Sequence, residues 1–553
     1  MAIQLGSISF DETVVIKQLK TDFRDDWFPD PIGYNDFISA GLLPDIILEN
    51  FQKNHGTYSP AQALLLNVPK SNFTLRYALE TSFTDRAIYH SLAMHLLPFY
   101  DRTISQWVFS HRANGSVAGD RSDSKYVFRN GIQAWNDFLG CVQSAIKPGT
   151  VLLSTDLANY FENINLKKLK EIMLESVPTL DADAGQKSQL RQYIEQLFSC
   201  LSSWSFNIER GLPQNRDASS FLANVYMRSV DQVMLEKGYT YFRYMDDIKV
   251  VCQSEGAAKL ALKELILALR PLGQFVNGGK TNIVAAEDEC RIRECLDLPS
   301  IEMKRIDSAW ASKALNPISR SFVPLKKLAT ETLTAGKFHS REFRFCVNRL
   351  ETLARCSEFK VPPAYFNDLT PLVISGLDAA PVATDQICRY LRAIELNDGD
   401  FAAIAEHLID NAKGIYNWKN YRLWVLMTQK EFRSDALMER ARTIISDHGD
   451  NPTRAGATLY LGAFGTVGDR ELIATNFHQL KSFLGQRNAI IAVQQLHFRP
   501  ATGKQVGIST HVSAYLRDDL KGAYRALKRG GVYAEKLEPV SITRYIEQER
   551  DYD

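Results

Sequence analysis

Three features that would indicate a particular class of protein are missing from the 553-residue sequence: a charge excess, a long apolar run and a secretory leader. The 65 Lys and Arg residues are balanced by 64 Asp and Glu residues, so the formal net charge is +1. Since each contact with a nucleic-acid phosphate needs a cation, this balance disfavours an extended, sequence-independent grip on a long duplex. No stretch approaches the ~18 apolar residues that cross a bilayer, and the first 20 residues lack a basic region followed by an apolar one. We therefore expect a cytoplasmic protein with no membrane partner.

Cysteine is also sparse and follows no pattern. The eight cysteines are scattered, and none forms a CxxC pair or a Cys/His cluster with the spacing of a zinc site. Free thiols in a chain of this length fit a reducing cytosol. The composition, 45% hydrophobic and 23% charged, is that of a globular protein and excludes a disordered, collagen-like or coiled-coil chain. At about 150 residues per domain, the length predicts two to four domains.

The sequence pattern changes twice along the chain, which predicts three regions: 1–147, 148–305 and 306–553. The first region is broken by Pro and Gly and is expected to contain short elements with long connections. From 150 to 285 the order is strand, helices, strand, turn, strand, helix and strand, which is that of a split βαβ sheet. Beyond about 310, strand signals fade and helical periodicity predicts stacked repeats. The predicted fold class is therefore α/β plus all-α.

Individual elements follow from the same periodicities. In the middle region we expect strands over 151–155 and 275–276, another over 283–284, and a hairpin that surrounds residues 245–247. In the last region the predicted helices cover 384–396, 401–413, 433–447, 454–464 and 470–484, and polar stretches such as NWKN separate them.

The strongest local signal is a pair of adjacent carboxylates, Asp246 and Asp247, in the turn of the predicted hairpin. Their charges repel each other unless a cation binds them. Asp156, at the end of the strand 151–155, supplies a third carboxylate. Three carboxylates from adjacent strands can hold two Mg²⁺ ions about 3.5–4 Å apart, the arrangement used for in-line phosphoryl transfer. A polar hairpin turn without a metal is the alternative interpretation.

Six segments between about 65 and 285 resemble, in order, the motifs of reverse transcriptases. Four of them are similar to palm motifs: STDLANYFENI (154–164), GLPQNRDASSFLANVYM (211–227), RYMDD (243–247) and FVNGGKTNIV (275–284). The other two, within 67–92 and 126–131, are similar to finger motifs. The resemblance implies reverse-transcriptase-like fingers and palm. It also implies DNA synthesis from dNTPs with two Mg²⁺ ions, for which Mn²⁺ can substitute.

The sequence departs from the usual reverse transcriptase pattern at two places, and these departures indicate a particular group within the family. Asn215, Arg216 and Asp217 replace the usual Gly-Ser-Pro after Gln214, and a long helical region follows the palm instead of a recognisable thumb, RNase H or endonuclease domain. This combination is similar to the bacterial abortive-infection (Abi) reverse transcriptases of antiphage defence. That family implies protein-primed DNA synthesis without a template and a HEAT-like helical C-terminal domain. We further expect a single-stranded DNA product, attached to the protein, and a homo-oligomer.

The resemblance assigns roles to the aspartates and to one aromatic residue. Asp156 and Asp246 are expected to bridge both metal ions, with Asp247 as a weaker ligand beside them. Phe161 falls where a ring packs against the position of a ribose 2′-OH, so it is expected to select dNTPs. The alternative for Phe161 is a core aromatic at the end of a strand.

Five further residues are expected to contact the nucleotide. Gln214 and Asn215 would lie against its sugar and base. Lys70 and Arg76 would hold the triphosphate, and Lys280 would protonate the departing pyrophosphate. A turn before a helix and solvated surface charges would explain the same residues without a nucleotide. The loop NGGKT lacks the glycine spacing of a P-loop, so an ATPase is excluded.

A priming tyrosine would have to lie in a mobile segment in order to reach the metal ions. Tyr34 and Tyr58, in loops broken by Pro and Gly, and Tyr545 and Tyr552, in the polar tail, meet this condition, although packing is the alternative role for each. Two other functions remain open: an RNA-templated enzyme of the retron or group II intron type, and a non-enzymatic protein that kept a polymerase fold. The presence of all three aspartates disfavours the second.

Overall fold

The computed structural model describes residues 2–5, 8–23, 26–115, 126–205, 209–447, 449–496, 508–527 and 531–545. Over these ranges the chain is mostly helical, with small sheets. It separates into two compact units, each built from stretches that are not contiguous in sequence. Unit 1 comprises Met1–Asp26, Leu43–Leu65 and Tyr77–Leu298, and unit 2 comprises Trp27–Leu42, Leu66–Arg76 and Pro299–Asp553. None of the helices in the described ranges has the length and apolar character needed to span a bilayer.

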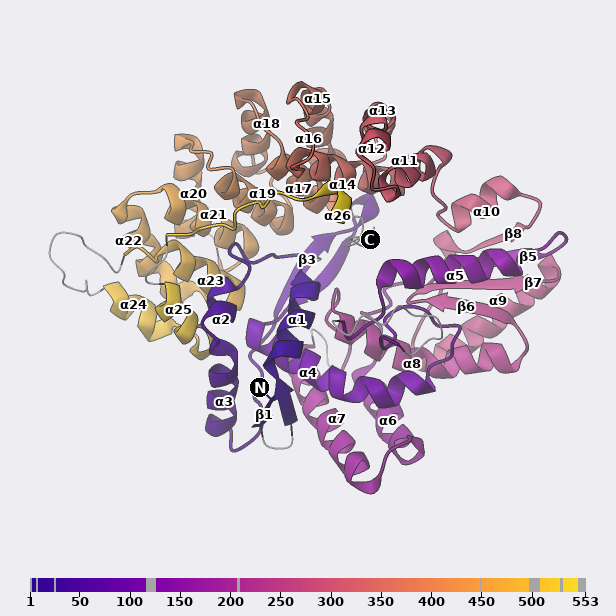
Figure 1. Cartoon of the computed structure of the whole chain (residues 1–553). Helices are drawn as coiled ribbons and strands as arrows, with labels where there is room; N and C mark the ends of the chain where they lie inside the picture. Colours follow the sequence, from indigo (N-terminus) through magenta and orange to yellow (C-terminus); the bar gives the residue numbers. More distant parts are fainter. Residues whose placement is uncertain are drawn as a thin grey trace. The chain divides into compact units, whose positions relative to one another are not determined.

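Unit 1 contains a four-stranded sheet and the helices that surround it (Figure 1). The four-stranded sheet consists of β5 Val151–Asp156, β6 Thr240–Tyr244, β7 Asp247–Cys252 and β8 Asn282–Ala285, and a separate two-stranded sheet consists of β1 Ala2–Leu5 and β2 Ile8–Asp11. The helices of unit 1 are α1 Glu12–Asp22, α3 Leu42–Lys53, α4 Phe83–Tyr100, α5 Gly131–Ala145, α6 Leu166–Ser176, α7 Ala184–Trp204, α8 Asp217–Glu236, α9 Glu255–Leu269 and α10 Glu289–Cys295. The hairpin of β3 Leu64–Pro69 and β4 Leu75–Glu80 is divided between the two units.

The four-stranded sheet has the order β6-β7-β5-β8, and its neighbouring strands are antiparallel. The predicted strand 151–155 and the predicted hairpin are confirmed, and β8 is the strand expected over 283–284. The strand expected over 275–276 is wrong, because Val276 forms only an isolated bridge with Leu157. Two residues that pair through one bridge do not propagate a ladder, so the segment stays a loop.

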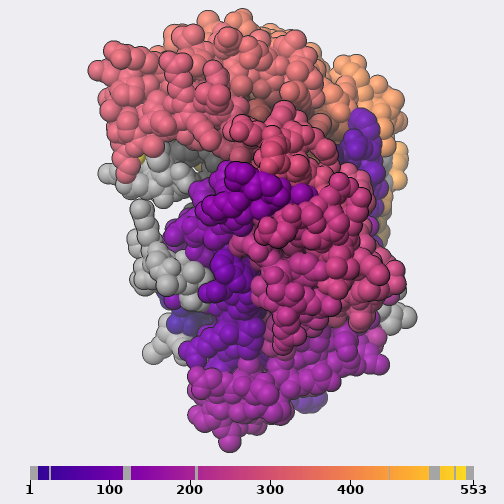
Figure 2. Space-filling model, turned by 90° about the vertical axis from the view of Figure 1, so that its right-hand side faces the viewer, coloured from indigo at the N-terminus to yellow at the C-terminus, as the bar shows by residue number. Residues whose placement is uncertain are grey.

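Helices cover both faces of this sheet. On one face Phe138 and Val142 of α5 pack with Leu152, Phe242 and Val251 in a buried cluster. Side chains alternate between faces along a strand, so residues one position away from these point to the other face, where α8 and α9 lie (Figure 1). Figure 2 shows the purple surface of residues near 140 next to the rose-coloured surface of residues beyond about 240. Packing on both faces therefore holds the strands in place, and with them the residues at the strand ends.

The first 147 residues contain long helices, which corrects the expectation of short elements. Helix α4 runs for 18 residues, and Pro98 lies in its last turn rather than at a break. Most of its side chains are buried all round the helix, including Phe83, Ile88 and Leu92. A helix enclosed on all sides has no apolar stripe of period 3.6, so the sequence pattern does not reveal it.

The described residues of unit 2 form helices and their connections, apart from the share of the β3–β4 hairpin that belongs to this unit. Its helices are α2 Asn35–Ser39, α11 Ile301–Ala311, α12 Leu315–Arg320, α13 Phe322–Thr334, α14 Arg341–Arg355, α15 Ala364–Asn367, α16 Thr370–Ala379, α17 Thr384–Ala393, α18 Asp398–Ile409, α19 Asn417–Gln429, α20 Asp435–Asp447, α21 Pro452–Phe464, α22 Val467–Thr475, α23 Phe483–Ala492, α24 Ile508–Tyr515, α25 Lys521–Leu527 and α26 Ile542–Tyr545.

The helices expected in this region are present, with two corrections. The polar stretch NWKN, expected to separate helices, is the first turn of α19, where Trp418 is buried and donates from Nε1 to the carbonyl of Trp27 at 2.8 Å. The helix expected over 470–484 is instead α22 and a short 3₁₀ turn. Burial of the aromatic side chain against a distant segment overrides the local turn signal at 417–420.

Candidate active site

The three aspartates meet at one end of the four-stranded sheet. Asp156 is the last residue of β5 and pairs in register with Asp247, the first residue of β7. Cross-strand partners project to the same face, so these two side chains are neighbours. Asp246 lies in the turn between β6 and β7, and its carbonyl accepts from the backbone N–H of Leu157 at 3.1 Å.

A buried arginine, Arg243, stabilises this turn through a hydrogen bond to its backbone. Met245 has a φ of 54°, the left-handed region that non-glycine residues adopt only when the surroundings enforce it. Its carbonyl accepts from Nη1 of Arg243 at 3.0 Å. Arg243 is fully buried and forms an ion pair with Asp231 of α8 at 2.7 Å. Burial opposes its charge, but Asp231 raises the pKa of Arg243 above its usual value. The turn is thus fixed to α8, which supports the position of Asp246.

The carboxylates lie close enough to disfavour each other's ionisation. Burial, followed by the nearby charge of Asp156, raises the pKa of Asp246 to about 7. Burial also raises the pKa of Asp247, although Lys249 opposes this. Lysine Nζ atoms partly compensate the charge: Lys280 lies 3.1 Å from Oδ2 of Asp156, and Lys249 lies 2.5 Å from Oδ1 of Asp247. A site of this kind gains stability when further positive charge enters it.

The residues present suit a divalent cation held by two carboxylates. Within the described ranges no three His, Cys, Asp or Glu side chains are placed so that they could hold a metal ion together. Mg²⁺ in nucleotide-transferring sites is commonly bound by one or two carboxylates plus substrate phosphates and water. Asp156 and Asp246 are the pair that would hold such an ion, because the charge of Asp156 adds to burial in raising the pKa of Asp246. Asp247 is engaged by Lys249.

Phe161 and the turn after Gly211 lie next to each other. The backbone N–H of Leu212 donates to the carbonyl of Phe161 at 3.1 Å, and the Phe161 ring is partly exposed. Nε2 of Gln214 lies 3.5 Å from Oε1 of Glu162. Asn215 has a φ of 60°, and Asn tolerates this left-handed conformation better than most residues. The segment that follows Asp156 therefore lies next to the turn that contains Gln214 and Asn215.

Lys70 and Arg76 belong to unit 2, whereas the aspartates belong to unit 1. Lys70 follows β3 and its backbone N–H donates to the carbonyl of Thr74 at 2.7 Å. The guanidinium carbon of Arg76 lies 5.8 Å from the centre of the Trp27 ring. Both side chains are partly exposed. Their assignment to the triphosphate stays a prediction.

Two tyrosines expected to lie in mobile loops are buried, which corrects that expectation. Tyr34 is 3% exposed, and its ring lies 5.4 Å from the guanidinium carbon of Arg487. Tyr58 is 4% exposed and donates its hydroxyl hydrogen to Oδ1 of Asp85 at 2.7 Å. Pro and Gly break the local regular structure but do not prevent a neighbouring aromatic ring from packing. The side chain of Tyr545 and all of Tyr552 lie outside the described residues.

Two residues that contact the aspartates were not identified from the sequence. Lys249, 3% exposed, donates to Asp247 and to Oγ of Ser154 at 2.8 Å. The backbone N–H of Asn277 donates to the carbonyl of Asp156 at 2.7 Å, and its Nδ2 lies 3.4 Å from the Asp156 carboxylate. The period of two in the strand could have placed Lys249 on the face of Asp247. Asn277 lies within the motif FVNGGKTNIV, which is the signal that could have identified it.

The sequence matches a protein-family model over residues 68–312, described as reverse transcriptase (RNA-dependent DNA polymerase). The chain carries a reverse transcriptase domain. This domain is that of a nucleotidyltransferase of the reverse transcriptase type. Reverse transcriptases use divalent metal ions and bind nucleotides and nucleic acid, which agrees with the incompletely compensated carboxylates of Asp156 and Asp246.

Solved structures of telomerase are among those similar to this chain. The apo telomerase of Candida tropicalis, truncated from its C-terminal domain, is 15% identical over 44% of this chain, with a TM-score of 0.26. The telomerase of Candida albicans, in complex with a TWJ fragment of telomeric RNA, is 10% identical over 74% of this chain, with a TM-score of 0.29. The chain spans 55% and 66% of the lengths of these two proteins. No curated protein sequence matches it significantly.

Proposed function

We propose that the protein is a DNA polymerase of the reverse transcriptase family that acts in antiphage abortive infection. It transfers nucleotides at the end of the four-stranded sheet. The observation that carries the catalytic part is the register of the sheet, which pairs Asp156 with Asp247, the residue after Asp246; there burial, followed by the charge of Asp156, raises the pKa of Asp246 to about 7. Such a pair is costly to fold and becomes favourable when cations join it.

In this proposal the side chains of unit 1 have separate tasks. Asp156 and Asp246 would hold two Mg²⁺ ions, or Mn²⁺ in their place, which supply charge neutralisation for the triphosphate. A primer hydroxyl loses its proton to water and forms a bond to the α-phosphorus of a dNTP, while the bond from that phosphorus to pyrophosphate breaks. Lys280, 66% exposed on its side chain, delivers a proton to the pyrophosphate. Phe161 excludes a 2′-OH, and Gln214 and Asn215 contact sugar and base.

The finer part of the proposal is that synthesis uses no template and starts on a tyrosine of the protein, in the cytoplasm. Three features support it. Asn215, Arg216 and Asp217 bring bulk and charge to a turn that is usually Gly-Ser-Pro in the enzymes the sequence resembles. The chain has no excess of positive charge for a long duplex. Unit 2 is a long series of helices, which we propose to be HEAT-like repeats that mediate homo-oligomerisation.

The priming tyrosine must be accessible, which disfavours the two buried candidates. Among the described tyrosines, Tyr126 and Tyr515 expose 48% and 50% of their surface. Tyr545 and Tyr552 stay in the proposal as candidates in the tail. The product would be single-stranded DNA attached to one of these residues.

The test is to incubate the purified protein with Mg²⁺ and each labelled dNTP, without template or primer. Label that stays with the protein after boiling in detergent, and maps by mass spectrometry to a tyrosine, supports the proposal. A Tyr→Phe change at the modified residue should then abolish labelling. DNA that is made only when RNA and a primer are added would support the alternative, an RNA-templated reverse transcriptase of the retron or group II intron type. The match of residues 68–312 to reverse transcriptases, which are RNA-dependent DNA polymerases, agrees with that alternative.

A further inference from the structure

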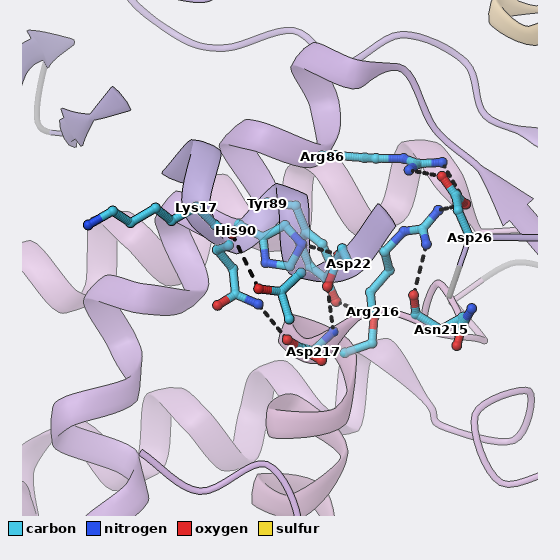
Figure 3. Close-up of polar contacts among 12 residues, drawn as sticks. Lys17, Asp22, Asp26, Arg86, Tyr89, His90, Asn215, Arg216 and Asp217 are labelled. Atoms are coloured by element: carbon cyan, nitrogen blue, oxygen red, sulfur yellow. Dashed lines mark hydrogen bonds and ion pairs between the residues drawn. The ribbon is translucent and has the colours of Figure 1, made fainter. Parts of the chain in front are cut away.

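A buried ion network lies next to Asn215, in the turn before α8 (Figure 3). Its members are Asp26, Glu80, Arg86 and Arg216, each at most 5% exposed. Nη1 of Arg86 lies 2.6 Å from Asp26, and Nη2 of Arg86 donates to Glu80. Nη2 of Arg216 lies 3.3 Å from Asp26 and 3.7 Å from Glu80. Two acidic and two basic side chains thus share one buried site in unit 1.

The charges in this network are unequally stabilised. Burial opposes ionisation of Asp26, but Arg86 and Arg216 lower the pKa of that carboxyl below its usual value. Burial raises the pKa of Glu80 to about 7 despite Arg86. Burying ion pairs adds little stability over apolar packing, and their best-attested use is to specify one arrangement. The network therefore calls for an explanation other than stability.

The guanidinium of Arg216, which pairs with Asp26, also binds the backbone of the turn. Nη1 of Arg216 donates to the carbonyl of Asn215 at 2.8 Å. Asn215 has the left-handed φ of 60°. Arg216 therefore links the turn carbonyl to the carboxylate of Asp26 through the fixed fork of one side chain, a geometry that Lys cannot reproduce.

Helix α1 fixes the other end of the turn. Asp217, the first residue of α8, accepts from Nε2 of Gln18, and its backbone N–H donates to Oδ1 of Asp22 at 3.4 Å. Asp22 is in turn paired with His90 of α4 (Figure 3). The stretch Gln214–Asp217 is thus fixed on both sides. Before it, the backbone of Leu212 is hydrogen-bonded to Phe161, and at its end Asp217 is bonded to α1, which is itself paired with α4.

We propose that Arg216 and Asp26 are positioning residues for the incoming nucleotide. They hold the Asn215 backbone so that Gln214 and Asn215 face the dNTP beside Phe161. This inference rests on the proposed function, and it makes α1 and Asp26 part of the polymerase domain rather than an appendage. It also explains why a large basic residue occupies the position after Asn215: the acidic partners at Asp26 and Glu80 require it.

The test compares two Arg→Lys changes on the same helix region. Arg216→Lys keeps the charge but loses the fork. Arg228→Lys is the matched control, because Arg228 of α8 bridges the hydroxyls of Thr103 and Ser176, at 3.0 and 2.8 Å, away from the turn. We measure the Kd of each fluorescently labelled dNTP with Mg²⁺, kcat and KM for incorporation, and the melting temperature of the full chain.

We expect Arg216→Lys to raise the Kd and KM about 10- to 100-fold, because a displacement near 1 Å costs that much in a positioned site. Arg228→Lys should leave the Kd within about twofold, and the melting temperatures of both should be similar. Equal Kd values for the two variants would overturn the inference. If Arg216→Lys does not fold, Asp26→Asn takes its place; failure of both to fold would show that the network is structural, which also overturns the inference.

The outcome separates this inference from the proposed function. A wild-type protein that binds dNTPs but incorporates none refutes the proposed function, while the ratio of the two Kd values still decides whether Arg216 positions a nucleotide. A wild-type protein that binds no dNTP refutes both.

Discussion

Lys249 is the residue on which the charge of Asp247 depends. It is 3% exposed and lies between Asp247 and Ser154. Removing one partner of a buried ion pair leaves a charge without compensation, which typically costs about 3–5 kcal/mol. The Asp247 side chain is 25% exposed, so water can partly compensate its charge and the lower end of this range applies. We therefore expect Lys249→Met to lower the free energy of unfolding of unit 1 by about 3 kcal/mol, measured by urea denaturation.

The control for this prediction is Lys259→Met on α9. Lys259 pairs with Glu255 one helical turn away, and both side chains are about two-thirds exposed. Exposed pairs of this kind contribute little. Equal effects of the two substitutions would contradict the role assigned to Lys249.

The selection between dNTPs and rNTPs can be assigned to one of two adjacent rings. Tyr160 is 3% exposed and donates its hydroxyl hydrogen to the carbonyl of Ala223 at 2.7 Å, whereas Phe161 is partly exposed. Phe161→Val should therefore raise rNTP use relative to dNTP use by tens to about a hundredfold, because a hydrophobic pocket discriminates by ~1–3 kcal/mol per small group. Competition between labelled dNTP and rNTP measures this ratio. Tyr160→Phe should leave it unchanged; a shift with Tyr160→Phe and none with Phe161→Val would contradict the assignment.

At the scale of helices and strands, the close approach of α21 and α23 depends on one glycine. A Cβ on Gly462 would lie 2.4 Å from both the Cα and the Cβ of Ala492. Gly462→Ala should therefore lower the melting temperature of unit 2, with a loss of about 1–3 kcal/mol in unfolding free energy. Gly468→Ala is the control, because the nearest atom to its Cβ is Oγ1 of Thr466 at 3.7 Å. A fall in melting temperature for Gly468→Ala but not for Gly462→Ala would contradict this packing.

The contact between α18 and α19 should be sensitive to pH. Burial, followed by the charge of Lys419, lowers the pKa of His407 to about 4. The ordinary value is near 6.5, so between pH 4 and 6.5 the unfolded chain binds more protons at this residue than the folded one. The stability contributed by neutral His407 is complete above pH 6.5 and is lost as the pH falls through this window, by about 1–3 kcal/mol.

Melting temperatures at pH 7 and pH 5 test this prediction. His407→Gln removes the titrating ring and keeps an acceptor for Lys419, which lies 3.3 Å from Nδ1 of His407. The wild type should lose more stability than this variant on acidification. An equal loss in both would contradict the assignment to His407.

The elements that carry the aspartates were predictable, because their signals are local. Strand β5 is a short apolar run that ends in Asp156, and β6 and β7 are two β-rich segments around a tight turn. Contacts between distant segments were not. The burial of Tyr34 depends on Arg487, and the first turn of α19 depends on Trp27. Pro, Gly and Asn report backbone preference and carry no information on such partners.

At the scale of the whole molecule, the two compact units do not follow the order of the sequence. Trp27–Leu42 and Leu66–Arg76 belong to the helical unit, although both precede the strands of the palm. Asp30 and Asp36, in the first of these segments, each form an ion pair of 2.6 Å with Arg487 of α23. All three side chains are buried. A single sequence cannot reveal such an exchange, because the two partners are more than 400 residues apart. Neither unit is therefore expected to fold from one uninterrupted fragment of the chain.

The measurement that tests the central claim most directly is nucleotide incorporation by Asp246→Asn at matched protein concentration. The account predicts a loss of at least about 100-fold, since cation stabilisation of the transferring phosphate contributes several kcal/mol. It also predicts that the melting temperature without divalent ions is unchanged or higher at pH 8, because the amide removes a charge that burial and Asp156 disfavour. Asp181→Asn, whose side chain is 91% exposed, should retain full activity. Undiminished incorporation by Asp246→Asn would contradict the assignment of the active site to the β6–β7 turn.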